Sequence, residues 1–154
     1  MPRFILHLCT APERRALWRA LLAALVVVIT WLALIPAPPK AITTGWDKSN
    51  HALAFASLAF ASAWAVWPRV RRWPLLFVVV LAYGGAIEIA QSYLPPREGD
   101  WLDLLADAVG ISLGLLLAWP VAVGAARRAG DEFLRHGRNP CCAGRARCWC
   151  SPRA

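Results

Sequence analysis

The segment EIAQSYLPPREGDWLDLLAD, which runs from Glu88 to Asp107, places ionisable side chains between two long apolar runs. Glu88 and Gln91 are three residues apart, so they share one face of a helix. After two prolines a second apolar run begins, in which Asp103 and Asp107 are four residues apart and share a face in the same way. Ionisable groups are costly to keep inside a membrane. The pattern therefore predicts a polar site that helices build near one surface of a membrane.

The composition of the chain is that of an integral membrane protein. Of its 154 residues, 58% are hydrophobic, and the mean hydropathy is +0.47. These values are too apolar for a soluble domain, and the length allows only one compact unit. The net charge of +8 comes from residues between and beyond the apolar runs, without a basic and aromatic surface, so no nucleic-acid partner is expected.

Four apolar runs predict an all-α fold, an integral membrane four-helix bundle. The runs cover residues 17–35, 52–67, 74–94 and 101–124. At 1.5 Å per residue the first run spans roughly 28 Å, close to the ~30 Å hydrocarbon core of a bilayer. A cleaved signal peptide is the rival interpretation of this run. We favour a membrane helix, because the run is long for a signal peptide and the proline-rich segment after it makes a poor cleavage site.

Two basic ends flank the predicted membrane domain. We assign residues 1–16 to a short basic N-terminus, residues 17–124 to the four-helix transmembrane domain, and residues 125–154 to a basic tail that we expect to be mostly disordered. The tail contains Cys141, Cys142, Cys148 and Cys150. Their spacing differs from that of a recognised zinc-binding pair, so an incidental flexible end is the favoured interpretation over a zinc site.

The distribution of positive charge predicts the orientation of the bundle. If both ends and the connection at residues 69–72 lie on one side, only Lys40, Lys48 and Arg97 of the 17 Lys and Arg residues lie on the other. By the positive-inside rule both termini are then cytoplasmic. We expect a multi-pass protein of the cell inner (cytoplasmic) membrane, with the loops before the second and fourth helices facing outward.

Small residues at helical spacing predict how two of the helices pack. The fourth run carries Gly110 and Gly114 on one stripe with Ala106 and Ala118, and the second run carries alanines at the same spacing. Such stripes let membrane helices approach closely, so we assign helix packing to the two glycines. A merely amphipathic buried helix is the alternative for the second run.

The polar residues of three helices are expected to meet at the outer end of the bundle. Counting from the outer loops places Glu88 and Asp107 at about the same depth, roughly 10 Å down. The start of the second helix adds further polar groups, with Asp47 and His51 one turn apart. The candidate polar site comprises Asp47, Lys48, His51, Glu88, Gln91, Arg97, Asp103 and Asp107. The alternative is that these groups only hold the helices together through hydrogen bonds and an ion pair.

The same residues carry a resemblance to a known family. The chain has Asp47-Lys48-x-x-His51, then Glu88-x-x-Gln91, Pro96-Arg97 and Asp103-x-x-x-Asp107-x-x-Gly110-x-x-x-Gly114. In the order and spacing of these blocks, over roughly residues 20–122, it resembles the VanZ-like family of small integral membrane proteins. The resemblance implies a four-helix membrane domain and, from the founding member of the family, a link to low-level resistance to the glycopeptide teicoplanin. The family more usually has asparagine where this chain has Asp107.

Three functional hypotheses follow. The first is a non-catalytic protein of the cell envelope that binds a lipid-linked or cell-wall component through Lys48, Arg97 and the carboxylates. The second is a membrane-embedded enzyme that uses His51 and a carboxylate as acid and base. The third is a membrane scaffold. A metal bound by His51 with two or three carboxylates is an alternative, but the spacing gives no metal-ligand signature, so neither a metal nor another cofactor is assigned. Catalysis is the less favoured hypothesis, and the ligand and the oligomeric state stay open.

Overall fold

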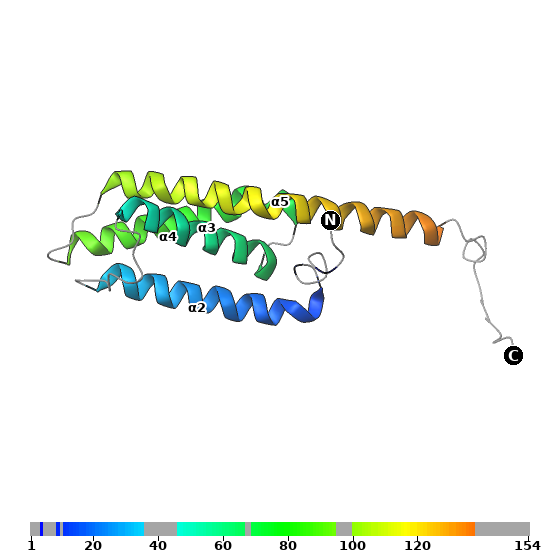
Figure 1. The fold of residues 1–154 in the computed structure, drawn as a ribbon, viewed down its shortest axis with the longest axis horizontal. Helices are drawn as coiled ribbons and strands as arrows, with labels where there is room; N and C mark the ends of the chain where they lie inside the picture. The colour runs from blue at the N-terminus through cyan, green and yellow to red at the C-terminus, as the bar shows by residue number, and fades with distance from the viewer. Residues whose placement is uncertain are drawn as a thin grey trace, which may run out of the picture.

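The chain forms a bundle of four long helices. The computed structural model describes Phe4, Cys9 and residues 11–35, 46–66, 69–94 and 100–137. In this part of the chain every regular element is helical: α2 (Arg15–Leu34), α3 (Asp47–Ala65), α4 (Trp73–Ser92) and α5 (Trp101–Gly137), with short 3₁₀ turns η1 (Pro12–Arg14) and η3 (Val70–Arg72). The four long helices lie side by side along the long axis of the molecule (Figure 1). The predicted all-α four-helix bundle is confirmed.

Length, hydropathy and surface identify the bundle as an integral membrane protein. The segments Arg15–Leu34, Val70–Ser92 and Trp101–Arg128 are long and apolar enough to cross a membrane, with mean hydropathies of 2.2, 1.8 and 1.9. Helix α3 is less apolar because charged and polar residues occupy its first turns. Large apolar side chains cover the outside: Val27, Val78 and Leu117 are 66%, 61% and 68% exposed. Such a surface suits lipid and not water.

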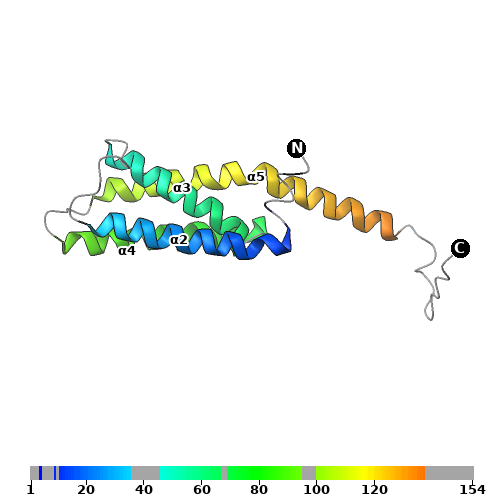
Figure 2. The same ribbon diagram turned by 60° about the horizontal axis from the view of Figure 1, so that its bottom comes forward.

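Helices α3 and α5 pack closely through small residues, and this contact sets the centre of the bundle. A Cβ atom added at Gly110 would overlap the backbone of Ala52, and one added at Gly114 would overlap the backbone of Ala56. The two helices therefore touch backbone to backbone, as small-xxx-small stripes allow in membranes. Figure 2 shows that α3 and α5 are neighbours and cross each other at an angle.

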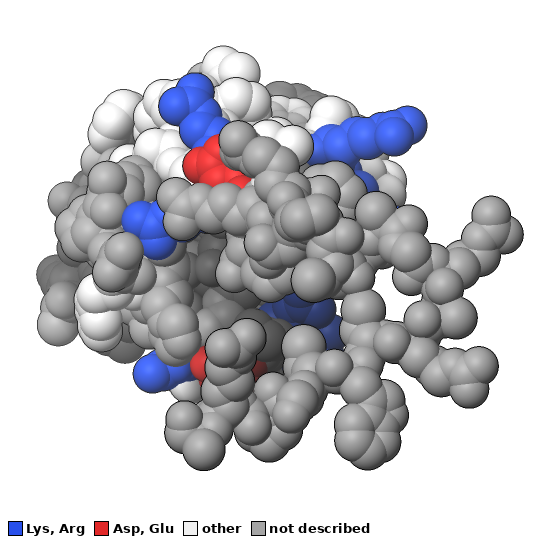
Figure 3. Space-filling view, turned by 90° about the vertical axis from the view of Figure 1, so that its right-hand side faces the viewer, with Lys and Arg blue, Asp and Glu red and all other residues white. Residues whose placement is uncertain are grey.

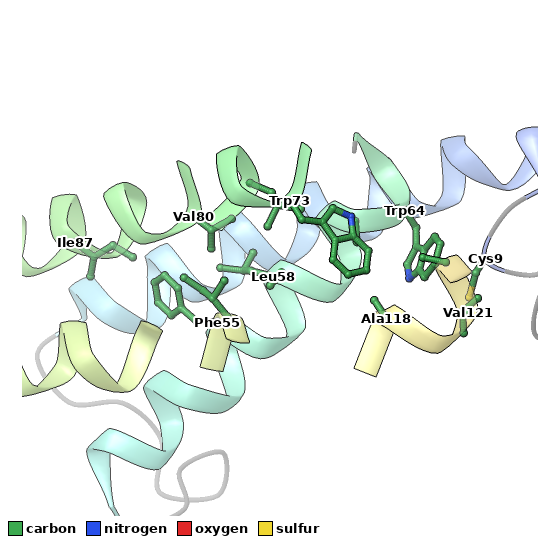
Figure 4. Packing of buried hydrophobic residues seen from close by; sticks show 14 residues of the cluster. Cys9, Phe55, Leu58, Trp64, Trp73, Val80, Ile87, Ala118 and Val121 are labelled. Atoms are coloured by element: carbon green, nitrogen blue, oxygen red, sulfur yellow. The ribbon is translucent and has the colours of Figure 1, made fainter. Parts of the chain in front are cut away.

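The core lies between α3, α4 and α5. Phe55, Leu58, Leu76 and Ile111 are its largest fully buried apolar side chains. Figure 4 shows Phe55 and Leu58 of α3 facing Val80 and Ile87 of α4, while Trp64 lies near Ala118 and Val121 of α5. Since lipid tails are as apolar as these residues, close packing and hydrogen bonds, more than burial from water, hold the helices together.

Helix α2 lies at the edge of the bundle and is tied to it by polar contacts. None of its residues is fully buried. Near its start the Arg19 Nε donates to the Ala65 carbonyl at 3.3 Å, at the end of α3, where helix carbonyls lack partners. Further along, the hydroxyls of Thr30 and Tyr83 are 2.7 Å apart. These contacts add to an apolar interface with the core, to which α2 contributes Trp18, Leu22, Leu25, Val26, Ile29 and Ala33.

Helix α3 begins at Asp47, so the polar turn expected at the start of the second helix is helical and precedes its apolar run. The end of the last helix differs from the prediction. Helix α5 continues to Gly137, which makes residues 125–137 helical and not an irregular tail. The physical reason is that this stretch contains alanine, arginine and leucine, which favour helix even without apolar periodicity. The tail cysteines lie outside the described residues.

Candidate functional site

One end of the bundle gathers polar side chains, and the opposite end gathers arginines. Helices α2 and α4 end, and α3 and α5 begin, at the end on the left of Figure 1. The other end holds the start of α2, the η3 turn and the later part of α5, which carry Arg14, Arg15, Arg69, Arg71, Arg72, Arg127 and Arg128. Figure 3 looks onto this second end, where Lys and Arg side chains lie around the molecule.

At the rim of the polar end, a lysine joins α3 to the start of α5. The Lys48 Nζ lies 2.7 Å from the Asp100 Oδ2 and 3.0 Å from the Asp103 Oδ1. Asp100 also accepts from the Leu102 backbone N–H at 2.9 Å, so it caps α5. The Lys48 ammonium, together with this N–H, lowers the pKa of the Asp100 carboxyl from its ordinary value of 3.8. The positive charge of Lys48 is therefore already paired with the carboxylates of Asp100 and Asp103.

Below the rim, His51 of α3 and Asp107 of α5 form a pair. The His51 Nδ1 lies 2.9 Å from the Asp107 Oδ1, and Asp107 is 0% exposed. Where Asp107 is ionised, its carboxylate accepts this hydrogen bond and the His51 Nδ1 donates it. The imidazole stacks on the ring of Phe55, which lies one helical turn further along α3, and the angle between the two ring planes is 1°. The ring is thus held in place, and its second nitrogen, Nε2, faces Asp103, whose Oδ2 is 4.0 Å away.

A glycine on α4 makes room for this pair. A Cβ atom at Gly84 would overlap the Asp107 Oδ2 and press on the Phe55 ring. Any larger residue there would push Asp107 away from His51. Gly84 therefore belongs to the construction of the site, although the sequence pattern did not single it out.

Glu88 of α4 closes the cluster from the third side. Its Oε2 accepts from the Asp100 backbone N–H at 3.0 Å, an amide at the positive end of α5. Its Oε1 lies 3.9 Å from the His51 Nδ1 and has no hydrogen-bond partner among the described residues, although Glu88 is only 9% exposed. The Asp107 Oδ2 is likewise buried without a partner. Two buried acceptors are therefore unsatisfied.

Six of the eight predicted polar residues come together: Asp47, Lys48, His51, Glu88, Asp103 and Asp107. Gln91 does not join them. It donates to the Ala33 carbonyl at 3.0 Å and so ties α4 to the end of α2. Arg97 lies outside the described residues. Asp100 also contacts this cluster, although it is not among the eight predicted residues. Its position three residues before Asp103, at the start of a helix, could have indicated a helix cap in the same place.

The cluster is strongly acidic, which determines what it can do. Asp47, Glu88, Asp100, Asp103 and Asp107 supply five carboxylates, against the ammonium of Lys48 and the imidazole of His51. Among the described residues of the cluster, acceptors thus outnumber donors. Such a site favours hydroxyl or amide donors, or cations, over bare anions. The oriented imidazole adds a group that can accept a proton or bind a cation.

Comparison with known proteins adds a family and a distant relative. Residues 23–123 match the VanZ/LLP1 family. An uncharacterised protein of Schizosaccharomyces pombe is 32% identical over 100 residues, which cover 64% of this chain and 60% of that protein. The chain therefore spans less than two thirds of this relative. No solved structure matches this chain significantly.

Proposed function

This chain belongs to the VanZ/LLP1 family, and we propose that it binds the polar head group of a lipid-linked component of the cell envelope at the outer face of the cytoplasmic membrane. The arginines at the other end of the bundle support this orientation, because positive residues are retained on the cytoplasmic side. Both termini are then cytoplasmic, and the cluster around His51 faces outward.

The observation that carries the proposal is the buried oxygen of Glu88 that has no hydrogen-bond partner among the described residues. A cluster that only held helices together would be expected to pair its buried acceptors, as native proteins almost always do. The Glu88 Oε1 instead points toward His51 at 3.9 Å without a hydrogen bond. A ligand that donates a hydrogen bond would satisfy it.

The excess of acceptors indicates the chemistry of the head group. Lys48 is already held by Asp100 and Asp103, so it offers little to a free anion. Carboxylates accept hydrogen bonds from hydroxyl and amide groups, which sugars of cell-wall precursors carry. Apolar residues on either side of the cluster, Ile89 and Leu105, are 63% and 61% exposed, so a lipid can approach from the bilayer.

Native mass spectrometry of the protein purified in mild detergent tests this proposal. We expect a lipid-linked molecule to remain bound to the natural chain and to be lost from Glu88→Gln. The matched control is Glu13→Gln, which makes the same chemical change in an exposed residue at the other end. Absence of any bound lipid from the natural chain, or equal retention by Glu88→Gln, would contradict the proposal.

The His51–Asp107 pair favours a second candidate, an enzyme that acts on the same class of lipid. An imidazole oriented by a buried carboxylate is suited to general acid-base catalysis. This candidate requires that cells overproducing the protein accumulate a chemically altered envelope precursor, and that His51→Gln abolishes the change. Identical precursor profiles by mass spectrometry would contradict it.

The resemblance to VanZ-like proteins suggests which effect the protein has on cells. If the head group belongs to a cell-wall precursor, its binding would alter the target of glycopeptides. We propose that the protein reduces susceptibility to teicoplanin. Comparing the susceptibility of cells with and without the protein checks this, and equal susceptibility would contradict it.

A further inference from the structure

The cluster also contains an arrangement that the sequence did not indicate, a candidate metal site. We propose that Asp47, His51 and Asp103 bind one divalent cation of the Mn²⁺ or Zn²⁺ class. One ligand atom from each residue lies within 4.8 Å of the others. Asp47 and His51 are one turn apart on α3, and Asp103 comes from α5. This proposal goes beyond head-group binding and does not depend on it.

The spacing of the three atoms is close to what an ion requires. Oxygen and nitrogen ligands lie about 2.1 Å from such ions, so two of them are at most ~4.2 Å apart. The His51 Nε2 and the Asp103 Oδ2 are already 4.0 Å apart. Asp47 is exposed at the rim, and its carboxylate oxygen lies within 4.8 Å of the other two ligand atoms. Small side-chain movements complete the site without moving a helix.

The orientation of His51 supports the assignment. Metal-binding histidines usually donate their second N–H to a carboxylate or a carbonyl, which fixes the tautomer and directs the lone pair at the ion. The His51 Nδ1 has such a partner in the Oδ1 of Asp107, at 2.9 Å. In that tautomer the Nε2 carries the lone pair, and the Asp103 Oδ2 lies 4.0 Å from it. The hydrogen-bond partner of His51 and its candidate metal ligands lie on opposite sides of the ring.

The surrounding charges favour a cation. Lys48 contacts the Oδ1 of Asp103 and leaves its Oδ2 for the ion. Lys48 offsets only part of the negative charge of the five carboxylates. Glu88 adds a further carboxyl group on the Nδ1 side of the imidazole, where its Oε1 lies 3.9 Å from the His51 Nδ1.

The ligand types indicate the class of ion. Imidazole suits Zn²⁺ and other transition metals, whereas carboxylates and water suit Mn²⁺, Mg²⁺ and Ca²⁺. One imidazole with two carboxylates selects ions that accept both. Three protein ligands also leave positions open for water or for an oxygen of a bound molecule.

Metal binding is tested on the full-length protein, stripped with EDTA in detergent and with no lipid added. MnCl₂ is titrated while electron paramagnetic resonance reports free Mn²⁺, and Zn²⁺ is used as a competitor. We expect one saturable site per chain, with affinity reduced at least 10-fold in Asp47→Asn, His51→Gln and Asp103→Asn. Asp131→Asn, which changes an exposed aspartate far along α5, is the matched control and should bind as the natural chain does.

Asp47→Asn keeps the test decisive if the two more buried variants fail to fold, because Asp47 is exposed and its replacement leaves the core intact. Circular dichroism checks the helix content of each variant. Absence of saturable binding of either ion to the natural chain overturns the proposal, and so does unchanged binding in folded Asp47→Asn. Neither result would affect the proposal of head-group binding, which is measured by lipid retention.

Discussion

The hydrogen bond between His51 and Asp107 joins α3 to α5, and Asp107 is fully buried. Its loss should therefore lower the free energy of unfolding. Asp107→Asn keeps an oxygen that accepts from the His51 Nδ1. We expect this variant to unfold within about 1 kcal/mol of the natural chain. Asp107→Leu leaves the buried N–H of His51 without a partner, and should cost about 1–3 kcal/mol.

Thermal unfolding in detergent measures both Asp107 variants. The same two variants also test the proposed metal site. Removing the hydrogen-bond partner of a metal-binding histidine typically lowers metal affinity 10–100-fold. We therefore expect Asp107→Leu to bind Mn²⁺ more weakly than the natural chain, and Asp107→Asn to bind it as the natural chain does. If the two variants behave alike, the hydrogen bond to His51 does not have the role assigned to it.

Gly84 and Gly85 are neighbours on α4 with opposite surroundings, which makes them a matched pair. A Cβ at Gly84 would collide with Asp107 and Phe55, whereas one at Gly85 would meet only Leu104, at an ordinary 3.9 Å. We expect Gly84→Ala to destabilise the protein by about 1–3 kcal/mol through overpacking. Gly85→Ala should be neutral or slightly stabilising, because alanine favours helix. Equal melting temperatures for the two variants would contradict this account.

The sequence could predict the residues of the cluster but not all their partners. Ionisable groups near the ends of apolar runs stand out, since membranes rarely contain them without a reason; this is how Glu88, His51 and Asp103 were found. Gln91 shares a face with Glu88, yet it bonds to the Ala33 carbonyl. That outcome depends on which helix lies beside α4. Spacing along one helix carries no information about its neighbours.

At the scale of elements, the contact between α3 and α5 rests on two glycines. Gly110→Ala and Gly114→Ala would each place a methyl group against the backbone of α3, where no side chain can move aside. We expect each to destabilise the bundle by about 1–3 kcal/mol. Gly130→Ala is the control, since nothing lies within 4 Å of its added Cβ. Unfolding of the three variants in detergent gives the comparison, and a loss in Gly130→Ala as large as in Gly110→Ala would refute the packing role.

Helix existence could be predicted, and helix ends could not. Hydropathy identifies apolar runs, and the polar first turn of α3 could be predicted only from the helical spacing of Asp47 and His51. The continuation of α5 to Gly137 was not predicted. Local helix propensity acts without apolar periodicity, which is why hydropathy alone does not mark either stretch.

For the whole molecule, the proposed orientation places the cluster outside the cytoplasm. Tyr93, 80% exposed at the end of α4, lies at the cluster end, and Arg71 lies at the opposite one. In intact cells a membrane-impermeant thiol reagent should label Tyr93→Cys and should label Arg71→Cys only after permeabilisation. The natural chain gives the background from its own cysteines. The reverse pattern would invert the bundle and move the cluster to the cytoplasmic face.

The central claim is that Glu88 serves a ligand and is not required to hold the bundle together. Thermal unfolding of Glu88→Gln, purified in detergent and freed of lipid, tests it most directly. Glutamine keeps an acceptor for the Asp100 N–H and removes a buried charge whose other oxygen is unpaired. The account predicts a melting temperature equal to or above that of the natural chain. A melting temperature several degrees lower would mean that Glu88 is part of the helix packing, and would contradict the claim.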